Sequence, residues 1–321
     1  MFRSALRLTL AICSLVVSGV FNEPFRAAAQ EPAADGPAKV KKVLLIGIDG
    51  CRFDALRKAD APHLGQLIAG GAYSSAAQIL GTRYRENDTI SGPGWSSILT
   101  GVWADKHGVH DNSFRGKQYD QYPHAFVRLK SVRPELSTAS FVTWEPIETQ
   151  ITAGATVSQA FIAENKDYAA ADEQCAQAAA ERLAAADDDF VFFYIGQVDE
   201  TGHAKGFHPT VPEYIAAIER ADRLVGRMLD TLNARATRAD EDWLIIVTSD
   251  HGGTGFTHSN GQNNPDILNS MLIVSGTSVT AGPLPSPVEI VDAVATAATH
   301  LGIAIDAQWG WDGRPQGLTQ P

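Results

Sequence analysis

Residues 42–49 read Lys-Val-Leu-Leu-Ile-Gly-Ile-Asp, a short and almost continuous apolar run that ends at an aspartate. Two later stretches repeat the pattern, because 190–198 runs into Asp199 and 243–249 runs into an Asp-His pair. Apolar runs of this length are typical of strands in a parallel sheet that is covered on both faces. Ligands gather beyond the carboxyl ends of the strands in such sheets. The sequence therefore predicts one polar site at one edge of a sheet.

The residues that end these runs are of the types that bind metal ions. Asp49, Asp199 and Asp250 bring three negative charges, and a serine alkoxide would bring a fourth. Two divalent cations would neutralise all four. Carboxylates combined with histidines favour zinc, with manganese or iron as alternatives. A single polar residue after a strand is more often a solvated loop residue, but three such positions favour a metal site and hydrolytic chemistry.

Four motifs follow one another in a defined order. They are Ile48-Asp49-Gly50, then Ser91-Gly92-Pro93-Gly94-Trp95 running through Leu99-Thr100-Gly101 to His107-Gly108-Val109, then Asp199-Glu200-Thr201-Gly202-His203, and finally Ser249-Asp250-His251-Gly252-Gly253. In this order they resemble the alkaline phosphatase superfamily, and within it the type I phosphodiesterase/nucleotide pyrophosphatase branch. The resemblance extends from residue 40 to the tail at 309–313. It implies an alkaline phosphatase-like α/β fold, with a mostly parallel central sheet and helices on both faces.

The resemblance also implies which residues form the site. By motif position it assigns one metal ion to Asp49, Ser91, Asp250 and His251, and the other to Asp199, His203 and His258. Shorter relatives carry the last histidine soon after the Asp-His-Gly motif, as here, whereas the nucleotide phosphodiesterases carry it much later. Asn112 falls where the family has an asparagine that contacts the phosphoryl oxygen.

Ser91 is the expected nucleophile. A serine at its ordinary pKa is a poor nucleophile and must be activated. Two metal ions about 3.5–4 Å apart can stabilise the entering and leaving oxygens of an in-line displacement, which would leave a phosphoseryl intermediate for water to hydrolyse. We expect a tight turn at 92–94 and a short helix from Trp95 to Leu99, with Ser91 at its N-terminus, where the helix dipole favours an anion. Taken alone, Ser91 would be interpreted as a plain N-cap.

Departures from relatives bear on the substrate. Sulfatases of the superfamily carry Cys or Ser followed by x-Pro-x-Arg, and here Trp95 takes the arginine position, which disfavours sulfatase chemistry. Nucleotide phosphodiesterases usually have a threonine nucleophile followed by a phenylalanine that stacks on the base. Ser91 and Gly92 occupy these two positions here, so the resemblance does not imply specificity for nucleotides.

Several other side chains have alternative roles. Trp144 either replaces the missing stacking face or belongs to the core. Arg83 and Arg85 either bind a phosphate oxygen, which would favour monoesters, or belong to a solvated loop. His110, Lys205 and His208 are candidates to line the entrance, and the segment 113–170 is expected to shape specificity.

The expected function is therefore a metal-dependent phosphoric ester hydrolase that acts on a small phosphorylated substrate, with diesters ahead of monoesters. The alternatives are a phosphomonoesterase or a phosphonate hydrolase of the same superfamily. An inactive metal-binding module is less consistent with an intact nucleophile and ligand set.

The first 29 residues have the features of a secretory signal peptide. Arg3 and Arg7 precede an apolar stretch at 8–20, and small residues follow at 27–29. The stretch is shorter than the about 18 residues that a membrane span needs, so no transmembrane segment is expected. We expect a disordered linker at 30–39 and a single catalytic domain at 40–321, in a secreted or periplasmic protein.

Composition excludes some partners and leaves others open. A net charge of −11 disfavours coating of nucleic acid or anionic membranes, but bound metals would still attract a small anionic substrate. Cys51 and Cys175 could form a disulfide in an oxidising compartment, although we favour unpaired, packed thiols. The sequence carries no signal for oligomeric state.

Apolar patterning predicts the rest of the scaffold. Helices are expected at 63–69, 171–186, 212–234 and 288–301, and further strands at 139–143 and 271–274. Because strands and helices alternate, we expect a doubly wound sheet.

Overall fold

The computed structural model describes Met1 and residues 39–319. The predicted signal peptide and nearly all of the predicted linker lie outside the described residues. From Lys39 onward the chain belongs to one compact unit, Lys39–Pro321. In the described part of the chain, no helix combines the length and apolar character needed to cross a bilayer.

An eight-stranded sheet forms the centre of this unit, with strand order β4-β3-β5-β1-β6-β7-β2-β8. The strands are β1 (Val40–Ile48), β2 (Ala72–Gln78), β3 (Thr138–Val142), β4 (Val157–Ala160), β5 (Phe190–Ile195), β6 (Glu241–Thr248), β7 (Asn269–Ser275) and β8 (Gly282–Pro283). Strand β7 runs antiparallel to both of its neighbours, and all other pairs are parallel. The predicted mostly parallel sheet is confirmed.

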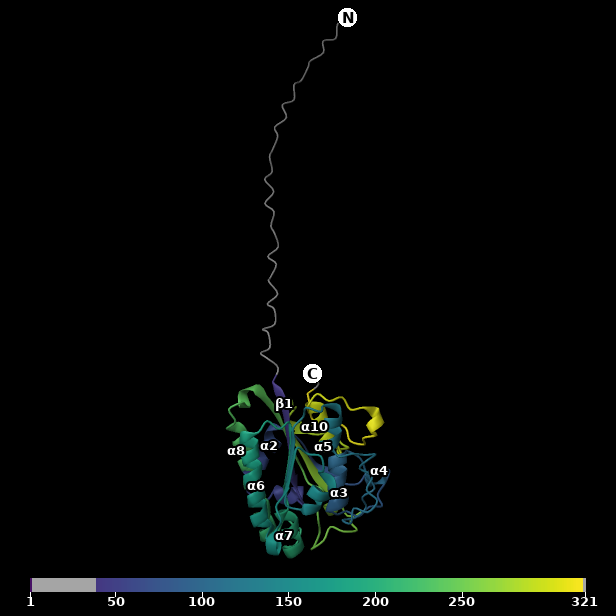
Figure 1. Cartoon of the computed structure of the whole chain (residues 1–321), viewed down its shortest axis with the longest axis vertical. Helices are drawn as coiled ribbons and strands as arrows, with labels where there is room; N and C mark the ends of the chain where they lie inside the picture. The colour runs from purple at the N-terminus through teal and green to yellow at the C-terminus, as the bar shows by residue number, and fades with distance from the viewer. Residues whose placement is uncertain (2–38, 320–321) are drawn as a thin grey trace. The chain divides into compact units, whose positions relative to one another are not determined.

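Helices cover both faces of this sheet (Figure 1). One face carries α2 (Pro62–Gly70), α6 (Tyr168–Ala185) and α8 (Pro212–Asn233), and the other carries α3 (Ser91–Thr100), α5 (Ala125–Val132) and α10 (Asp292–His300). Side chains alternate along β1, so that Val43 and Leu45 enter one core while Leu44 and Ile46 enter the other. Two apolar layers therefore hold the strands between the helices.

The remaining helices and helical turns complete the fold. They are α1 (Phe53–Leu56), α4 (Ala104–His107), α7 (Gln197–Lys205), α9 (Pro265–Leu268), and the helical turns η1 (Ile147–Ile151), η2 (Glu164–Lys166), η3 (Arg238–Asp240) and η4 (Ala307–Trp309).

Three expected boundaries were wrong. Strand β5 ends at Ile195 because Gly196 turns the chain with φ −101° and ψ −20°, so Asp199 lies in the first turn of α7 rather than directly after a strand. Residues 92–94 are helical rather than a separate turn, since a proline in the first turn of a helix has no intrahelical hydrogen bond to lose. Helix α10 begins late because Glu289 still forms a bridge to β2.

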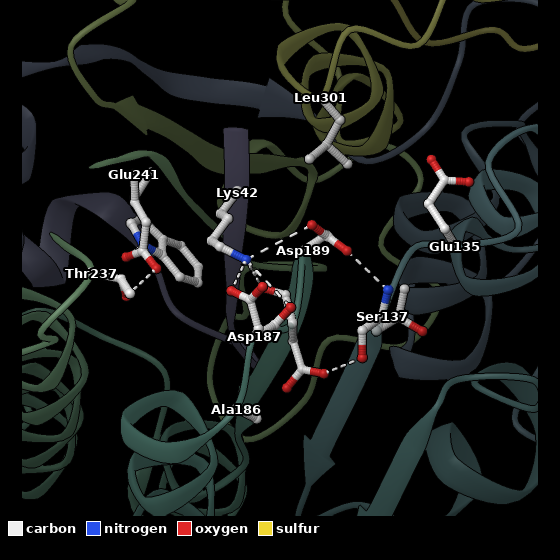
Figure 2. Close-up of polar contacts among 12 residues, drawn as sticks. Lys42, Glu135, Ser137, Ala186, Asp187, Asp189, Thr237, Glu241 and Leu301 are labelled. Atoms are coloured by element: carbon white, nitrogen blue, oxygen red, sulfur yellow. Dashed lines mark hydrogen bonds and ion pairs between the residues drawn. The ribbon is translucent and has the colours of Figure 1, made fainter. Parts of the chain in front are cut away.

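Charged side chains are paired where the central strands begin. We call this group the amino-edge network, and it comprises Lys42, Arg182, Arg235, Asp187, Asp188, Asp189 and Glu241 (Figure 2 shows several of them). The buried Lys42 Nζ lies 2.8 Å from an Asp187 carboxylate oxygen and 3.8 Å from one of Asp189. Arg235 lies 2.6 Å from Glu241 in a pair that is almost fully buried. Each acidic group of this network has a basic partner.

Both cysteines of the described chain, Cys51 and Cys175, are buried free thiols. The expectation of unpaired thiols is confirmed.

Candidate metal centre

The candidate ligands come together at the carboxyl edge of the sheet. Asp49 follows β1, Asp250 and His251 follow β6, and α7 after β5 supplies Asp199 and His203. Ligand atoms fall into two groups, each within 4.8 Å: one is Asp49, Asp250 and His251, and the other is Asp199, His203 and His258. These groups correspond to the two sets that the motif positions imply.

Ser91 joins the first of these groups. It is the first residue of α3, and its hydroxyl oxygen lies 3.5 Å from Asp49 Oδ1 and 3.4 Å from His251 Nε2. The side chain is buried, and the positive end of the α3 dipole favours negative charge there. Ser91 therefore lies beside two of the residues that the motif positions assign to the same ion, although the helix starts earlier than expected.

Backbone carbonyls fix the orientation of all three histidines. The Nδ1 atoms of His203, His251 and His258 lie 3.0, 2.9 and 3.0 Å from the carbonyl oxygens of Phe256, Gly252 and Thr89. Because a carbonyl oxygen only accepts, each Nδ1 carries a proton, and Nε2 of the neutral ring presents its lone pair to the cluster. Histidines that bind metals are oriented in this way.

As a result, nitrogen and oxygen atoms that only accept hydrogen bonds lie close together in the cluster. The Nε2 atoms of His203 and His258 are 2.9 Å apart, and His251 Nε2 lies 3.2 Å from Asp250 Oδ2. The buried oxygens Asp199 Oδ1 and Asp250 Oδ2 have no hydrogen-bond partner. Lone pairs that face one another at these distances repel unless a cation or a proton lies between them. The donor set and its orphaned oxygens therefore fit two divalent cations.

Two hydrogen bonds hold Asp49 in place. Its Oδ2 atom accepts from Trp95 Nε1 at 2.9 Å and from the Tyr194 hydroxyl at 2.6 Å, which leaves Oδ1 directed at Ser91. The Trp95 ring can reach β1 because Gly47 has no Cβ, which would lie 2.3 Å from that ring.

The electrostatics of the cluster are unfavourable without a cation. Burial, followed by repulsion from Asp199, raises the pKa of Asp49 to about 6. Burial also raises the pKa of Asp250 well above its ordinary value. The hydrogen bond with Asp199 raises the pKa of His203 to about 9.

A cavity of about 240 Å³ opens beside the cluster. Ser91, Asn112 and Trp144 lie on its wall. Asn112 Oδ1 accepts from the Gly92 N–H at 2.7 Å, which leaves its amide nitrogen free to donate. Trp144 also packs on Phe114, with ring centroids 6.1 Å apart, so it contributes to both the cavity and the core.

The other basic candidates lie elsewhere. Arg83 is committed to ion pairs with Asp105 and Asp312 at 2.8 and 2.9 Å, and Arg85 donates to the carbonyl of Gln262. His110 pairs with Tyr84, and His208 pairs with Thr210. None of these four candidates lines the cavity. The phosphate-binding alternative for Arg83 is therefore disfavoured.

A second, larger groove of about 610 Å³ adjoins this cavity and shares Tyr168, Glu200 and His203 with it. Lys205, a candidate to line the entrance, lies on the wall of this groove and not on that of the smaller cavity.

Some residues around the site escaped sequence reasoning. Trp95 and Tyr194, which hold Asp49, and Tyr168 and Glu200, which line both hollows, were not singled out. Tyr194 offered a signal, because it is the only hydroxyl-bearing residue near the carboxyl end of an otherwise apolar strand.

Comparisons with known proteins identify relatives of this chain. The family model described as type I phosphodiesterase/nucleotide pyrophosphatase matches residues 43–300. Human ectonucleotide pyrophosphatase/phosphodiesterase family member 7 is 26% identical over 274 residues, which cover 78% of this chain and 54% of the relative. This chain therefore spans about half the length of that relative.

Solved structures share the fold. Murine ectonucleotide pyrophosphatase/phosphodiesterase 5, in an inactive form in complex with AMP, has a TM-score of 0.63 at 14% identity and covers 82% of this chain and 96% of its own. The phosphonate monoester hydrolase of Silicibacter pomeroyi has a TM-score of 0.61 at 17% identity, with coverage of 86% and 75%. The family model extends from β1 to the end of α10 and so includes both ligand groups. The chain belongs to the type I phosphodiesterase/nucleotide pyrophosphatase family, within the alkaline phosphatase superfamily.

Proposed function

We propose that this protein is a metal-dependent phosphoric ester hydrolase with Ser91 as its nucleophile. One observation carries the proposal: two groups of three ligands meet at one sheet edge, and the Ser91 hydroxyl lies beside one of them. Asp49, Ser91, Asp250 and His251 would hold one divalent cation, and Asp199, His203 and His258 the other. Nitrogen and carboxylate ligands favour zinc, with manganese or iron as alternatives.

The bound cations would supply positive charge for the serine alkoxide and for the leaving oxygen of an in-line displacement. Ser91 Oγ loses its proton and attacks phosphorus, and the ester oxygen departs and takes up a proton. Water then hydrolyses the phosphoseryl bond, which releases the phosphoryl group and restores the Ser91 hydroxyl. Asn112 donates from its free amide nitrogen to a phosphoryl oxygen, where a fixed donor is most effective. Trp95 and Tyr194 keep Asp49 oriented throughout.

Phosphodiesters are the preferred substrate class. The commitment of Arg83 to two aspartates removes the guanidinium that would bind the extra charge of a monoester. Relatives named as pyrophosphatases and phosphodiesterases support the same preference. A phosphomonoesterase and a phosphonate hydrolase, as in the similarly folded Silicibacter pomeroyi protein, are the alternatives that the assay distinguishes.

The assay compares release of nitrophenol from bis-nitrophenyl phosphate, nitrophenyl phosphate and a nitrophenyl phosphonate. We expect the highest kcat/KM for the diester, and loss of all turnover when a chelator removes the metal. Turnover that persists after complete metal removal would reject the proposal, whereas a monoester or phosphonate preference would only change the substrate class.

Ser91 variants test the covalent step. Ser91→Ala should lower kcat by at least about 10³-fold, because losing a nucleophile removes the whole covalent route. Ser91→Thr should retain substantial activity, because it keeps the hydroxyl. Ser96→Ala, on the same helix but bonded to the Gly92 carbonyl and Tyr119, is the matched control. Unchanged turnover by Ser91→Ala would contradict the mechanism.

We also propose that the protein is exported, and that 40–321 acts as a single catalytic domain. The N-terminal sequence pattern supports export. Mass spectrometry of the mature protein should find its N-terminus near residue 30, and an unprocessed N-terminus would count against export.

A further inference from the structure

Asp172 is a buried carboxylate near the site that belongs to neither of the two candidate ligand groups. Asp172 lies on α6 with no exposed surface, among alanine and cysteine side chains of the buried face of that helix. Its Oδ1 atom accepts from the Thr143 hydroxyl at 2.7 Å and from the Gly196 N–H at 3.0 Å. Its Oδ2 atom accepts from the Gln197 N–H at 2.9 Å. A buried carboxylate requires such partners, and here two of them are backbone groups at the start of α7.

Helix α7 has no cap of its own. Its N-cap residue is Gly196, which has no side chain to accept a hydrogen bond from the first turn. Asp172 performs this task from a neighbouring helix, and its negative charge is favourable at the positive end of the α7 dipole.

The capped turn is the one that carries candidate ligands. Asp199 is the third residue of α7, and His203 follows one helical turn later. Their spacing from His258 is short, because the Nε2 atoms of His203 and His258 are 2.9 Å apart and His258 Nε2 lies 3.4 Å from Asp199 Oδ1. A small shift of α7 would therefore separate this ligand group.

Asp172 also connects other parts of the cavity wall. Thr143, which donates to it, is followed by Trp144, and Tyr168 lies one turn before it on α6. Both aromatic side chains line the cavity together with Gly196.

We propose that Asp172 is a positioning residue, which caps α7 from α6 and thereby holds Asp199 and His203 opposite His258. The inference rests on the proposed function, because these three residues must bind a cation for their spacing to matter. Asp172 would act on the affinity of one metal site without touching metal or substrate.

The chain contains a matched control. Asp222 on α8 is equally buried and accepts from the His63 and Leu64 N–H groups at 3.3 and 2.7 Å. It thus caps α2 across a helix pair, as Asp172 caps α7, but α2 carries no candidate ligand. Substituting Asp222 tests the loss of such a cap without disturbing the site.

The experiment titrates zinc into chelator-stripped, full-length protein in competition with a chromogenic chelator. We expect two zinc sites in the unsubstituted protein. Asp172→Asn should weaken one of them by about 10–100-fold, the range for residues that orient metal ligands, and leave the other unchanged. Asp222→Asn should lower thermal stability but leave both zinc affinities unchanged.

A double substitution identifies the affected site. In a His203→Ala background the α7 site is already lost, so Asp172→Asn should have no further effect on the remaining zinc affinity. If Asp172→Asn does not fold, Thr143→Val removes only one hydrogen bond to the carboxylate, and it should weaken the same site by up to roughly fivefold.

The outcomes separate the two proposals. Two intact zinc sites in Asp172→Asn, or in Thr143→Val where it is the variant tested, would overturn the role of Asp172 alone. An equal loss in Asp222→Asn, or a further loss in the His203→Ala background, would also overturn it. If the unsubstituted protein binds no zinc, manganese or iron, the proposed function itself fails.

Discussion

Acidic residues at the two edges of the central sheet differ in whether they pair with lysine or arginine. In the amino-edge network, Arg235 pairs with Glu241 and Arg182 pairs with Asp188. At the carboxyl edge, Asp49, Asp199 and Asp250 are equally buried, yet within the described chain no lysine or arginine forms an ion pair with any of them. The same sheet therefore has carboxylates with basic partners at one edge and carboxylates without a lysine or arginine partner at the other.

The pKa values of Glu241 and Asp49 express this difference. Burial raises the pKa of Glu241, but hydrogen bonds from Arg235, Trp243 and Thr237 outweigh it and lower the value to about 2. Burial dominates at Asp49 and raises its pKa to about 6. Perturbed carboxylates without a basic partner concentrate at functional sites, so we infer that the amino edge serves stability and that the carboxyl edge holds the proposed metal site.

The largest expected effect comes from removing a carboxyl-edge ligand. Asp250→Asn should lower kcat/KM by about 10³-fold or more, because a cation contributes several kcal/mol to transition-state stabilisation. The metal-free variant should be at least as stable as the metal-free parent, since a buried uncompensated charge is gone. Steady-state kinetics and urea unfolding check both statements, and marked destabilisation of the metal-free variant would contradict the comparison.

The second-largest effect is expected at the amino edge, where a substitution should lower stability and leave activity unchanged. Arg235→Met should destabilise the fold by about 3 kcal/mol, because it leaves Glu241 buried without its cation. Turnover per folded molecule should stay the same, because the network lies at the opposite edge. The free energy of unfolding in urea and active-site titration test this, and a selective loss of kcat would argue against separate roles for the edges.

Zinc should stabilise the protein through the carboxyl edge alone. At zinc concentrations about 100-fold above Kd, binding adds about 2.7 kcal/mol per site to the free energy of unfolding. Arg235→Met should gain as much from zinc as the parent, whereas Asp250→Asn should gain less. Thermal melts with and without zinc give the comparison, and equal gains by both variants would place the binding elsewhere.

The smallest effect is a pH dependence from Glu241. Its pKa falls from 4.5 to about 2 on folding, so its stabilising contribution is present above pH 4.5 and is lost as the pH falls toward 2. Glu241→Gln should therefore lose less stability than the parent between pH 5 and pH 3, where this group takes up a proton in the unfolded chain but stays ionised in the folded one. Parallel stability profiles for the two proteins in urea would refute this assignment.

The sequence predicted those features that depend on local pattern. The apolar runs before Asp49 and Asp250 identified the central strands, and the motif order implied the two ligand sets that the structure brings together. The end of β5 was missed because Val198 continues the apolar run, although the chain already turns at Gly196.

Other features depend on contacts between distant segments. Trp95 and Tyr194 reach Asp49 only after α3 and β5 pack around β1, and no local spacing encodes that. The capping of α7 by Asp172 likewise joins two helices whose register follows from tertiary packing. The start of α3 was misjudged for a local reason, because Pro93 is compatible with both a turn and a first helical turn.

The most direct test is anomalous diffraction at the zinc edge from crystals grown with zinc. The account predicts two peaks per chain, one among Asp49, Asp250, His251 and the Ser91 hydroxyl, and one among Asp199, His203 and His258. An ordered site without zinc at these positions, or a Ser91 hydroxyl remote from both peaks, would contradict it.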